Sequence, residues 1–160
     1  MTTTTQDAIC HPSHVRRIWG DQPMGEIRLD VTLSNAIDGS LAAEGKLAES
    51  EVRQFTGNAM VDTGAIMTVL PRQVADKLGL KVTSRRRVTL ADGSRQTVDV
   101  IAPVYVEILG RDTFEDCLVR GDDILIGQTV LEKTDLFIDC ANAAVVPNPD
   151  HPDEPILYVK

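Results

Sequence analysis

Residues 59–71 of the chain read Ala-Met-Val-Asp-Thr-Gly-Ala-Ile-Met-Thr-Val-Leu-Pro. An isolated Asp-Thr-Gly tripeptide usually marks only a turn. Here a predicted strand over residues 52–61 leads into Asp62, and a second apolar run over residues 66–70 follows the turn and ends at Pro71. The stretch therefore predicts a carboxylate held at a turn between two buried strands.

The segment after this turn carries a helix signal and a hairpin signal. Pro71 is suited to the first position of a helix, and Gly79 to the position after its end. Two further strands are predicted over residues 81–91 and 94–109, joined at Ala91-Asp92-Gly93-Ser94. Asp-Gly between β-rich segments is a strong hairpin signal, so the chain is expected to turn back on itself there.

The remainder of the patterned region is also predicted to be mainly β. Alternating apolar residues from Glu26 to Leu33 indicate a half-buried strand, whereas the small and polar residues 36–50 favour a loop or insertion. Pro103 predicts an edge or a bulge in its strand. The later elements are expected to be strands 113–119 and 124–127, a short helix 128–133, and a hairpin of 136–139 with 143–147.

The domain limits follow from composition. Residues 1–23 are polar and turn-rich and predict an N-terminal extension, which is either native or an autoprocessed pro-segment. Residues 24–148 are expected to form one domain, and residues 149–160 a proline-rich acidic tail. Met24 is an alternative natural start.

Charge and cysteine content limit the possible partners and compartment. The chain has 160 residues, with 24 acidic and 16 basic side chains and a net charge of −8, which disfavours nucleic-acid and anionic-membrane surfaces. The three cysteines, Cys10, Cys117 and Cys140, suit a reducing compartment, and no apolar run is long enough to span a membrane. A cytoplasmic location is expected, with Cys117 and Cys140 buried as small apolar residues.

The residue types around Asp62 suit hydrolysis by water. One group must take a proton from the water while another protonates the amide, and two close carboxylates can divide this work because both cannot be ionised. Gly64 allows close backbone approach and offers an N–H donor, and the Thr63 hydroxyl can brace the turn. Val61 and Ala65 would seat the turn on apolar layers.

The order strand, Asp-Thr-Gly-Ala, apolar strand, helix, hairpin, Ile-Leu-Ile-Gly and short helix resembles the retroviral-type (retropepsin-like) aspartic protease family, including its bacterial members, over roughly residues 26–147. The resemblance implies a single-lobe, closed β-barrel of the acid protease fold with one or two short helices, and neither metal nor cofactor. It implies that Asp62 is catalytic, that Thr63 braces the active-site loops and that Gly64 lines the cleft. The substrate would also meet Ala65 and a mobile flap, formed by Ala91, Asp92, Gly93 and Ser94.

The chain holds a single Asp-Thr-Gly, so a carboxylate pair requires two copies of Asp62 in a homodimer. Such a dimer would bind an extended peptide or protein segment by main-chain hydrogen bonds. The family's usual acidic residue after Asp-Thr-Gly-Ala and the arginine after the later glycine are replaced here by Ile66 and Gln128. The dimer must therefore be held differently or more weakly, and a catalytically weak or idle dimerisation or peptide-binding module is the alternative function.

Three weaker patterns remain. Cys10, His11 and His14 could begin a metal site, but a chance polar stretch is favoured because a fourth ligand is missing. Arg85-Arg86-Arg87 could contact an acidic partner, although a solvated hairpin arm is favoured given the net negative charge. His151 has no evident partner in the sequence.

Overall fold

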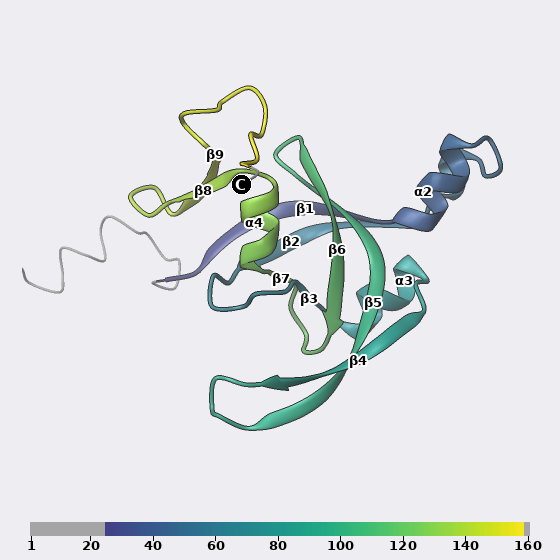
Figure 1. Cartoon of the computed structure of the whole chain (residues 1–160), viewed down its shortest axis with the longest axis horizontal. Coiled ribbons are helices and arrows are strands. Elements are labelled where there is room, and N and C mark those ends of the chain that lie inside the picture. The colour runs from purple at the N-terminus through teal and green to yellow at the C-terminus, as the bar shows by residue number, and fades with distance from the viewer. Residues whose placement is uncertain (1–24, 159–160) are drawn as a thin grey trace, which may run out of the picture.

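The computed structural model describes residues 25–158, so Cys10, His11, His14 and the rest of the predicted extension lie outside the described residues. Figure 1 shows a β-rich body with short helices at its margin. In chain order the elements are β1 (Ile27–Asn35), α2 (Ala36–Ala43), the 3-10 helix η1 (Glu49–Glu51), β2 (Gln54–Val61), β3 (Val69–Leu70), α3 (Arg72–Leu78), β4 (Val82–Thr89), β5 (Arg95–Ile108), β6 (Arg111–Val119), β7 (Leu125–Ile126), α4 (Gln128–Lys133), β8 (Leu136–Asp139) and β9 (Ala144–Pro147).

The larger sheet closes on itself. Its strands follow the order β1-β2-β7-β3-β6-β5-β4, and β1 also pairs with β5, with Leu33 opposite Val106. This additional pairing closes β1, β2, β7, β3, β6 and β5 into a ring and leaves β4 outside it, attached only to β5. The predicted mainly-β fold with a closed barrel is confirmed.

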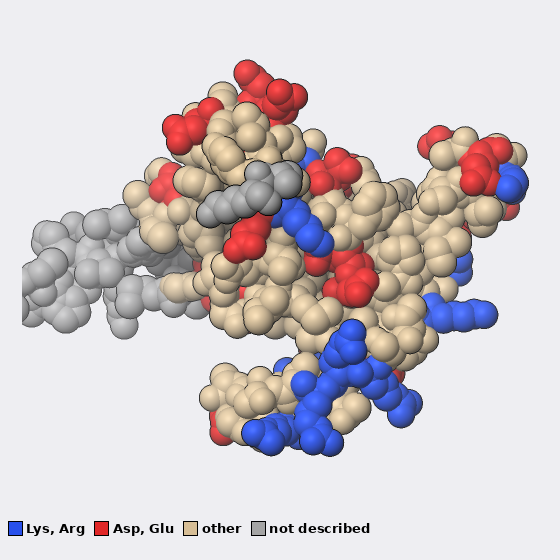
Figure 2. Space-filling view, in the orientation of Figure 1, with Lys and Arg blue, Asp and Glu red and all other residues tan. Residues whose placement is uncertain are grey.

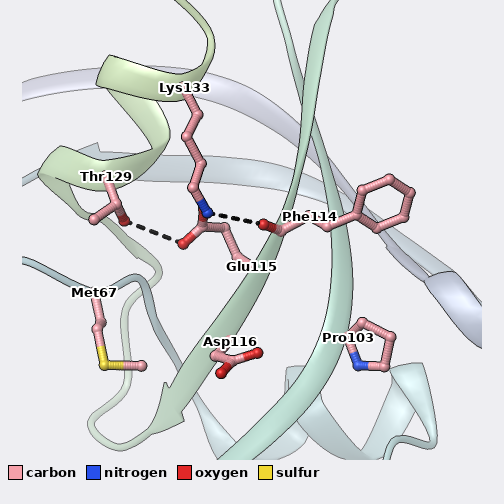
Figure 3. A pocket seen from close by; sticks show the side chains of 7 residues that line it. All are labelled: Met67, Pro103, Phe114, Glu115, Asp116, Thr129 and Lys133. Atoms are coloured by element: carbon pink, nitrogen blue, oxygen red, sulfur yellow. Dashed lines mark hydrogen bonds and ion pairs between the residues drawn. The ribbon is translucent and has the colours of Figure 1, made fainter. Parts of the chain in front are cut away.

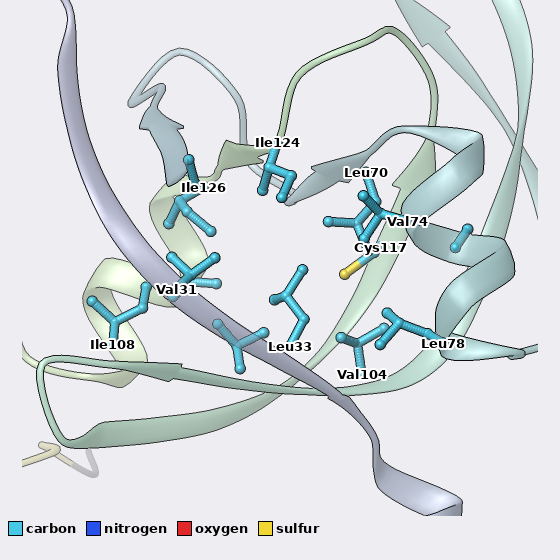
Figure 4. Packing of buried hydrophobic residues seen from close by; sticks show 14 of the residues in the cluster. Val31, Leu33, Leu70, Val74, Leu78, Val104, Ile108, Cys117, Ile124 and Ile126 are labelled. Carbon is cyan, nitrogen blue, oxygen red and sulfur yellow. The ribbon is translucent and has the colours of Figure 1, made fainter. Parts of the chain in front are cut away.

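An aliphatic core fills the ring. Alternate residues of β1 point inward, and Val31 and Leu33 are almost completely buried. Figure 4 shows these side chains meeting residues from β6, β7 and α3. Cys117 lies inside this core, as expected, and burial raises the pKa of its thiol. Cys140 was expected to be buried as well, but it is exposed because it follows β8 in a turn.

The predicted helix after Asp62 is confirmed, including both of its ends. Pro71 precedes the first turn, and Gly79 closes α3 in the left-handed conformation with φ 60°. A residue without a β-carbon adopts this conformation with little strain, so the glycine defines where the helix ends. The bulge expected near Pro103 is also present, as a register shift between Ile101 and Val104.

Residues 36–50, predicted as a loop or insertion, do connect the antiparallel strands β1 and β2, but the prediction missed that this connection contains helix α2. The Asn35 side chain caps the helix by accepting hydrogen bonds from the N–H groups of Ile37 and Asp38, at 2.9 and 3.1 Å. The buried Asp38 carboxylate in turn accepts two hydrogen bonds of 2.7 Å from Arg53. Arg53 lies directly before β2, so this contact ties α2 to the start of the next strand. It stabilises a helix that the small residues of α2 do not predict by themselves.

The prediction that His151 lacks a partner is also wrong. Its Nδ1 lies 2.7 Å from Asp135 Oδ2, and Asn148 donates to the other oxygen of the same carboxylate at 2.7 Å. The buried Arg111 guanidinium donates to the carbonyl oxygens of Asp135 and His151. These contacts join the chain after β9 to the end of the barrel.

Candidate active site

The backbone of Asp62 is fixed by the strand that runs beside it. β2 and β7 are parallel, with Val61 opposite Ile126. The N–H of Met60 donates to the carbonyl of Ile124 at 2.9 Å, and the N–H of Asp62 donates to the carbonyl of Ile126 at 3.0 Å. The apolar run 124–126 was predicted as a buried strand, and its function here is to hold the residue at which β2 ends.

The turn after Asp62 orients its carboxylate. The N–H of Gly64 donates to Asp62 Oδ1 at 2.9 Å, and the N–H of Ala65 donates to the Asp62 carbonyl at 3.1 Å. A β-carbon on Gly64 would lie 3.2 Å from Asp62 Oδ1, closer than ordinary van der Waals contact. Glycine therefore lets the backbone approach the carboxylate. Asp62 itself is half-buried, whereas Thr63 and Gly64 are exposed in the protomer.

The remainder of the loop rests on the junction of β7 and α4. The N–H of Gln128 donates to the Ala65 carbonyl at 2.9 Å, and the Thr129 hydroxyl donates to the Ile66 carbonyl at 3.0 Å. A β-carbon on Gly127 would lie 2.6–2.7 Å from backbone atoms of Ile66 and Met67. The glycine that ends Ile-Leu-Ile-Gly is thus required by the close approach of two backbone segments.

Two threonines that the sequence did not single out also position this loop. Thr68 is completely buried, and its hydroxyl accepts a hydrogen bond from the N–H of Gly127 at 3.4 Å. Thr129 Oγ1 lies 3.0 Å from the Ile66 carbonyl and 3.1 Å from the carboxylate of buried Glu115. A polar residue inside the otherwise apolar run 66–70 was the only available signal for Thr68.

The two positions expected to pair across a dimer have separate surroundings. The Ile66 side chain is 72% exposed, although its carbonyl is held by Thr129. The Gln128 side chain donates to Glu132 at 2.7 Å, along its own helix. No ion pair connects these two positions among residues 25–158. The large side chain exposed beside the Asp62 turn is the apolar Ile66.

The predicted flap is the tip of the β4–β5 hairpin. The N–H of Leu90 donates to the Ser94 carbonyl at 2.8 Å, and the N–H of Gly93, at φ +81°, donates to the Leu90 carbonyl at 2.9 Å. Hydrogen bonds from the Ser94 hydroxyl and N–H lower the pKa of Asp92. Ala91 to Ser94 are all exposed, and their hydrogen bonds stay within the hairpin. The structure therefore groups Asp62 with Gly64 and Ala65, and leaves the four flap residues apart from them.

A surface cavity of about 320 Å³ lies between Met67 of this loop and residues of β6 and α4. Figure 3 shows Met67 from the loop facing β6 and α4 across it, with dashed lines from Thr129 to Glu115 and from Lys133 to the Phe114 carbonyl. Glu115 also accepts a 2.7 Å hydrogen bond from Lys133. The full lining consists of Met67, Pro103, Phe114, Glu115, Asp116, Thr129 and Lys133. Because Glu115 also contacts Thr129, this ion pair supports the residue that holds the Ile66 carbonyl.

Within residues 25–158, no cluster of three or more His, Cys, Asp or Glu side chains could hold a metal ion. None of the helices in this part of the chain is long and apolar enough to cross a membrane.

Comparison with known families matches the chain to the aspartyl protease family over residues 43–130, more than half of the chain. The matched range includes Asp62, the β4–β5 hairpin and Gly127. None of the curated proteins compared with the chain matches it.

Proposed function

This chain belongs to the aspartyl protease family, and we propose that it is an endopeptidase whose active unit is a homodimer containing two copies of Asp62. The observation that carries the proposal is the position of Asp62. Its N–H is anchored to β7, its carboxylate is oriented by Gly64, and its side chain remains half-buried at the end of β2.

The proposed reaction divides proton transfer between the two carboxylates. An ionised Asp62 takes a proton from a water molecule as its oxygen attacks the peptide carbonyl, and the protonated Asp62 of the second copy protonates the carbonyl oxygen. The Asp62 that took the water proton then passes it to the nitrogen of the tetrahedral intermediate. The C–N bond breaks to release a carboxylic acid and an amine, and the other Asp62 regains a proton from one hydroxyl of the intermediate, so the pair returns to its starting state. Like charges at close range keep one proton on the pair, so acid and base are present together.

The homodimer is proposed because one protomer supplies half of this chemistry. The sequence holds a single Asp-Thr-Gly, and a second carboxylate must come from another chain. The exposed Thr63, Gly64 and Ile66 around Asp62 suit a symmetric contact at this loop. In this proposal Ile66 supplies an apolar contact where related enzymes use charges.

The substrate is proposed to be an extended peptide segment, bound between the catalytic loop and the β4–β5 hairpin. The hairpin tip, which includes Gly93 and hydrogen-bonds only within itself, can move without breaking contacts to the barrel. Its closure over a bound segment would exclude water from the reacting bond.

The alternative is an idle dimerisation or peptide-binding module of the same fold. It is favoured by one observation, the side chain of Gln128, which hydrogen-bonds within α4 where the family's arginine would face the dimer interface.

Replacing Asp62 by asparagine separates these functions. The amide keeps the size of the carboxylate but removes the base, so cleavage of a mixed peptide library should fall at least about a thousandfold. The matched control is Asp76→Asn, at an exposed site on α3, which should leave cleavage unchanged. Cleavage is measured by mass spectrometry of the products, and thermal unfolding of both variants checks the fold.

Two results would count against the protease. Equal cleavage by the wild type and Asp62→Asn would point to another catalyst. A stable wild-type dimer that cleaves nothing between acidic and neutral pH would favour the module.

A further inference from the structure

The β4–β5 hairpin has a charge opposite to that of the whole chain. The protein carries a net charge of −8, yet the hairpin concentrates exposed arginines. Figure 2 shows blue side chains gathered over this hairpin, at the bottom of the view, with an open notch between it and the barrel. The hairpin arginines are Arg85, Arg86, Arg87 and Arg95, and Arg72 and Arg120 border them.

Both faces of the hairpin are basic. Arg86 lies opposite Val98 in the β4–β5 register, whereas Arg87 lies opposite Thr97, and Arg95 opposite Thr89. Because successive residues of a strand point to opposite faces, Arg86 is on one face and Arg85, Arg87 and Arg95 are on the other. Whichever face covers a bound segment therefore presents guanidinium groups to it.

Only part of this charge is neutralised within the protomer. Asp99 accepts hydrogen bonds from Arg72 at 2.6 Å and from Arg85 at 3.1 Å, and these two arginines lower the pKa of its carboxyl group. The three remaining hairpin arginines, Arg86, Arg87 and Arg95, form no ion pair within residues 25–158.

The carboxylate at the tip does not neutralise them either. Asp92 is held by Ser94 within the turn, with the Ser94 N–H donating to it at 2.9 Å. Arg120, beside the hairpin, donates to the side-chain oxygen of Gln96 and adds a cation next to β5, and its charge also lowers the pKa of Asp92.

We propose that the arginines of the β4–β5 hairpin select peptide substrates that carry acidic side chains in the segment covered by the hairpin. This inference rests on the proposed function, because it assigns the substrate class of the same site. Guanidinium groups bind carboxylates through paired hydrogen bonds, and arginine stays charged at every pH at which an aspartic protease would work. The sequence alone favoured a hairpin arm whose arginines only face solvent. Such an arm does not require positive charge on both of its faces.

An acidic peptide fits this surface better than a nucleic acid does. Strong binding of polyanions depends on several phosphate contacts along an extended basic surface. Here the basic surface is limited to one hairpin on a body whose net charge is negative, and this body would repel the rest of a polyanion. A short acidic segment can reach the arginines without approaching the remainder of the protein.

The selection can be measured on binding and cleavage separately. The probes are two fluorescein-labelled ten-residue peptide pools with the same randomised uncharged residues, one with four fixed glutamates and the other with four glutamines. Binding is measured by anisotropy with the Asp62→Asn protein, which is not expected to cleave. Cleavage of the same pools is measured with the wild type.

The glutamate pool should bind roughly 3- to 10-fold more tightly than the glutamine pool, because each exposed ion pair contributes only modestly to the binding free energy. The preference for glutamate over glutamine should fall towards one with the triple substitution Arg86→Gln/Arg87→Gln/Arg95→Gln, but not with Lys46→Gln, an exposed cation between α2 and η1. It should also fall in 0.5 M salt, and below about pH 4, where glutamate becomes protonated.

The outcomes separate the two proposals. Equal binding of both pools, or a preference that survives the triple substitution, would overturn the arginine selection whether or not peptides are cleaved. Selective binding without any cleavage by the wild type would contradict the protease and leave a selective peptide-binding surface. Tight binding of duplex DNA at 0.15 M salt, without a preference between the pools, would assign the arginines to nucleic acid and also overturn the inference.

Discussion

The loop from Asp62 to Thr68 and the tip of the β4–β5 hairpin are both turns between strands, but they are held very differently. The loop receives hydrogen bonds from β7 and α4, and at Gly127 the two backbones are in close contact. The tip, residues 90–94, is exposed and hydrogen-bonds only within its own hairpin. One barrel can therefore hold the proposed catalytic carboxylate in place while leaving the proposed cover of the same site free to move.

The largest expected effect comes from a methyl group placed at Gly127, where the chain packs against the Asp62–Thr68 loop. In Gly127→Ala the new carbon would lie 2.6–2.7 Å from the backbone of Ile66 and Met67, and neither segment can move without breaking the loop's hydrogen bonds. We expect a loss of about 3 kcal/mol in the free energy of unfolding, measured by urea denaturation. A loss below about 0.5 kcal/mol would mean that the loop is not held as described.

The next effect tests Ile66, the large apolar side chain of the Asp62–Thr68 loop that faces solvent. Ile66→Glu places a charge where the proposed dimer buries an isoleucine that is 72% exposed in the protomer. Self-association, measured by sedimentation equilibrium, should weaken roughly 10- to 100-fold. Ile37→Glu, on α2 at 51% exposure, is the matched control and should leave self-association unchanged. Equal weakening in both variants would remove Ile66 from the interface.

A smaller effect on stability is expected from the same methyl group at the tip of the β4–β5 hairpin. In Gly93→Ala the new carbon meets nothing within 4 Å, and the cost comes only from a backbone at φ +81°. We expect about 1 kcal/mol of destabilisation by urea denaturation, well below that of Gly127→Ala. Gly39→Ala, inside α2 with open space around it, should instead be neutral or slightly stabilising. A Gly93→Ala loss as large as that of Gly127→Ala would contradict a free tip.

The smallest effect concerns a third region, the segment after β9, whose residues Asn148, His151 and Ile156 hydrogen-bond to Asp135. Hydrogen bonds from Asn148, Ile156 and His151 lower the pKa of Asp135 to about 2, from an ordinary value of 3.8. A carboxyl group with a lowered folded pKa stabilises the fold fully above 3.8 and loses that contribution as pH falls towards 2.

Thermal unfolding from pH 5 to pH 2 should therefore show a smaller loss of stability in Asp135→Asn than in the wild type. Asp150→Asn, at an exposed position in the same segment, is the control and should behave as the wild type. Parallel curves for the wild type and Asp135→Asn would show that this carboxylate does not fasten the segment.

Local signals in the sequence were sufficient to predict where several helices and strands begin or end. The ends of α3 were predicted from Pro71 and Gly79, and the β4–β5 hairpin from Asp92-Gly93, because these residues restrict the backbone by themselves. Helix α2 was missed because its stability depends on the contact between Asp38 and Arg53, which are distant in sequence. The partner of His151 was missed for the same reason.

The sequence by itself determined the place of Asp62 in its turn and the glycines around it, because turn chemistry is a local property. The single Asp-Thr-Gly in the sequence is also the basis for proposing a second copy. Only the tertiary structure decided how the loop is held, through Thr68, Thr129 and the contact of Gly127 with backbone atoms some sixty residues away. Closure of the ring through β1 and β5 was likewise decided by packing. Such contacts depend on which segments the folded barrel brings together, and neighbouring residues along the chain do not encode them.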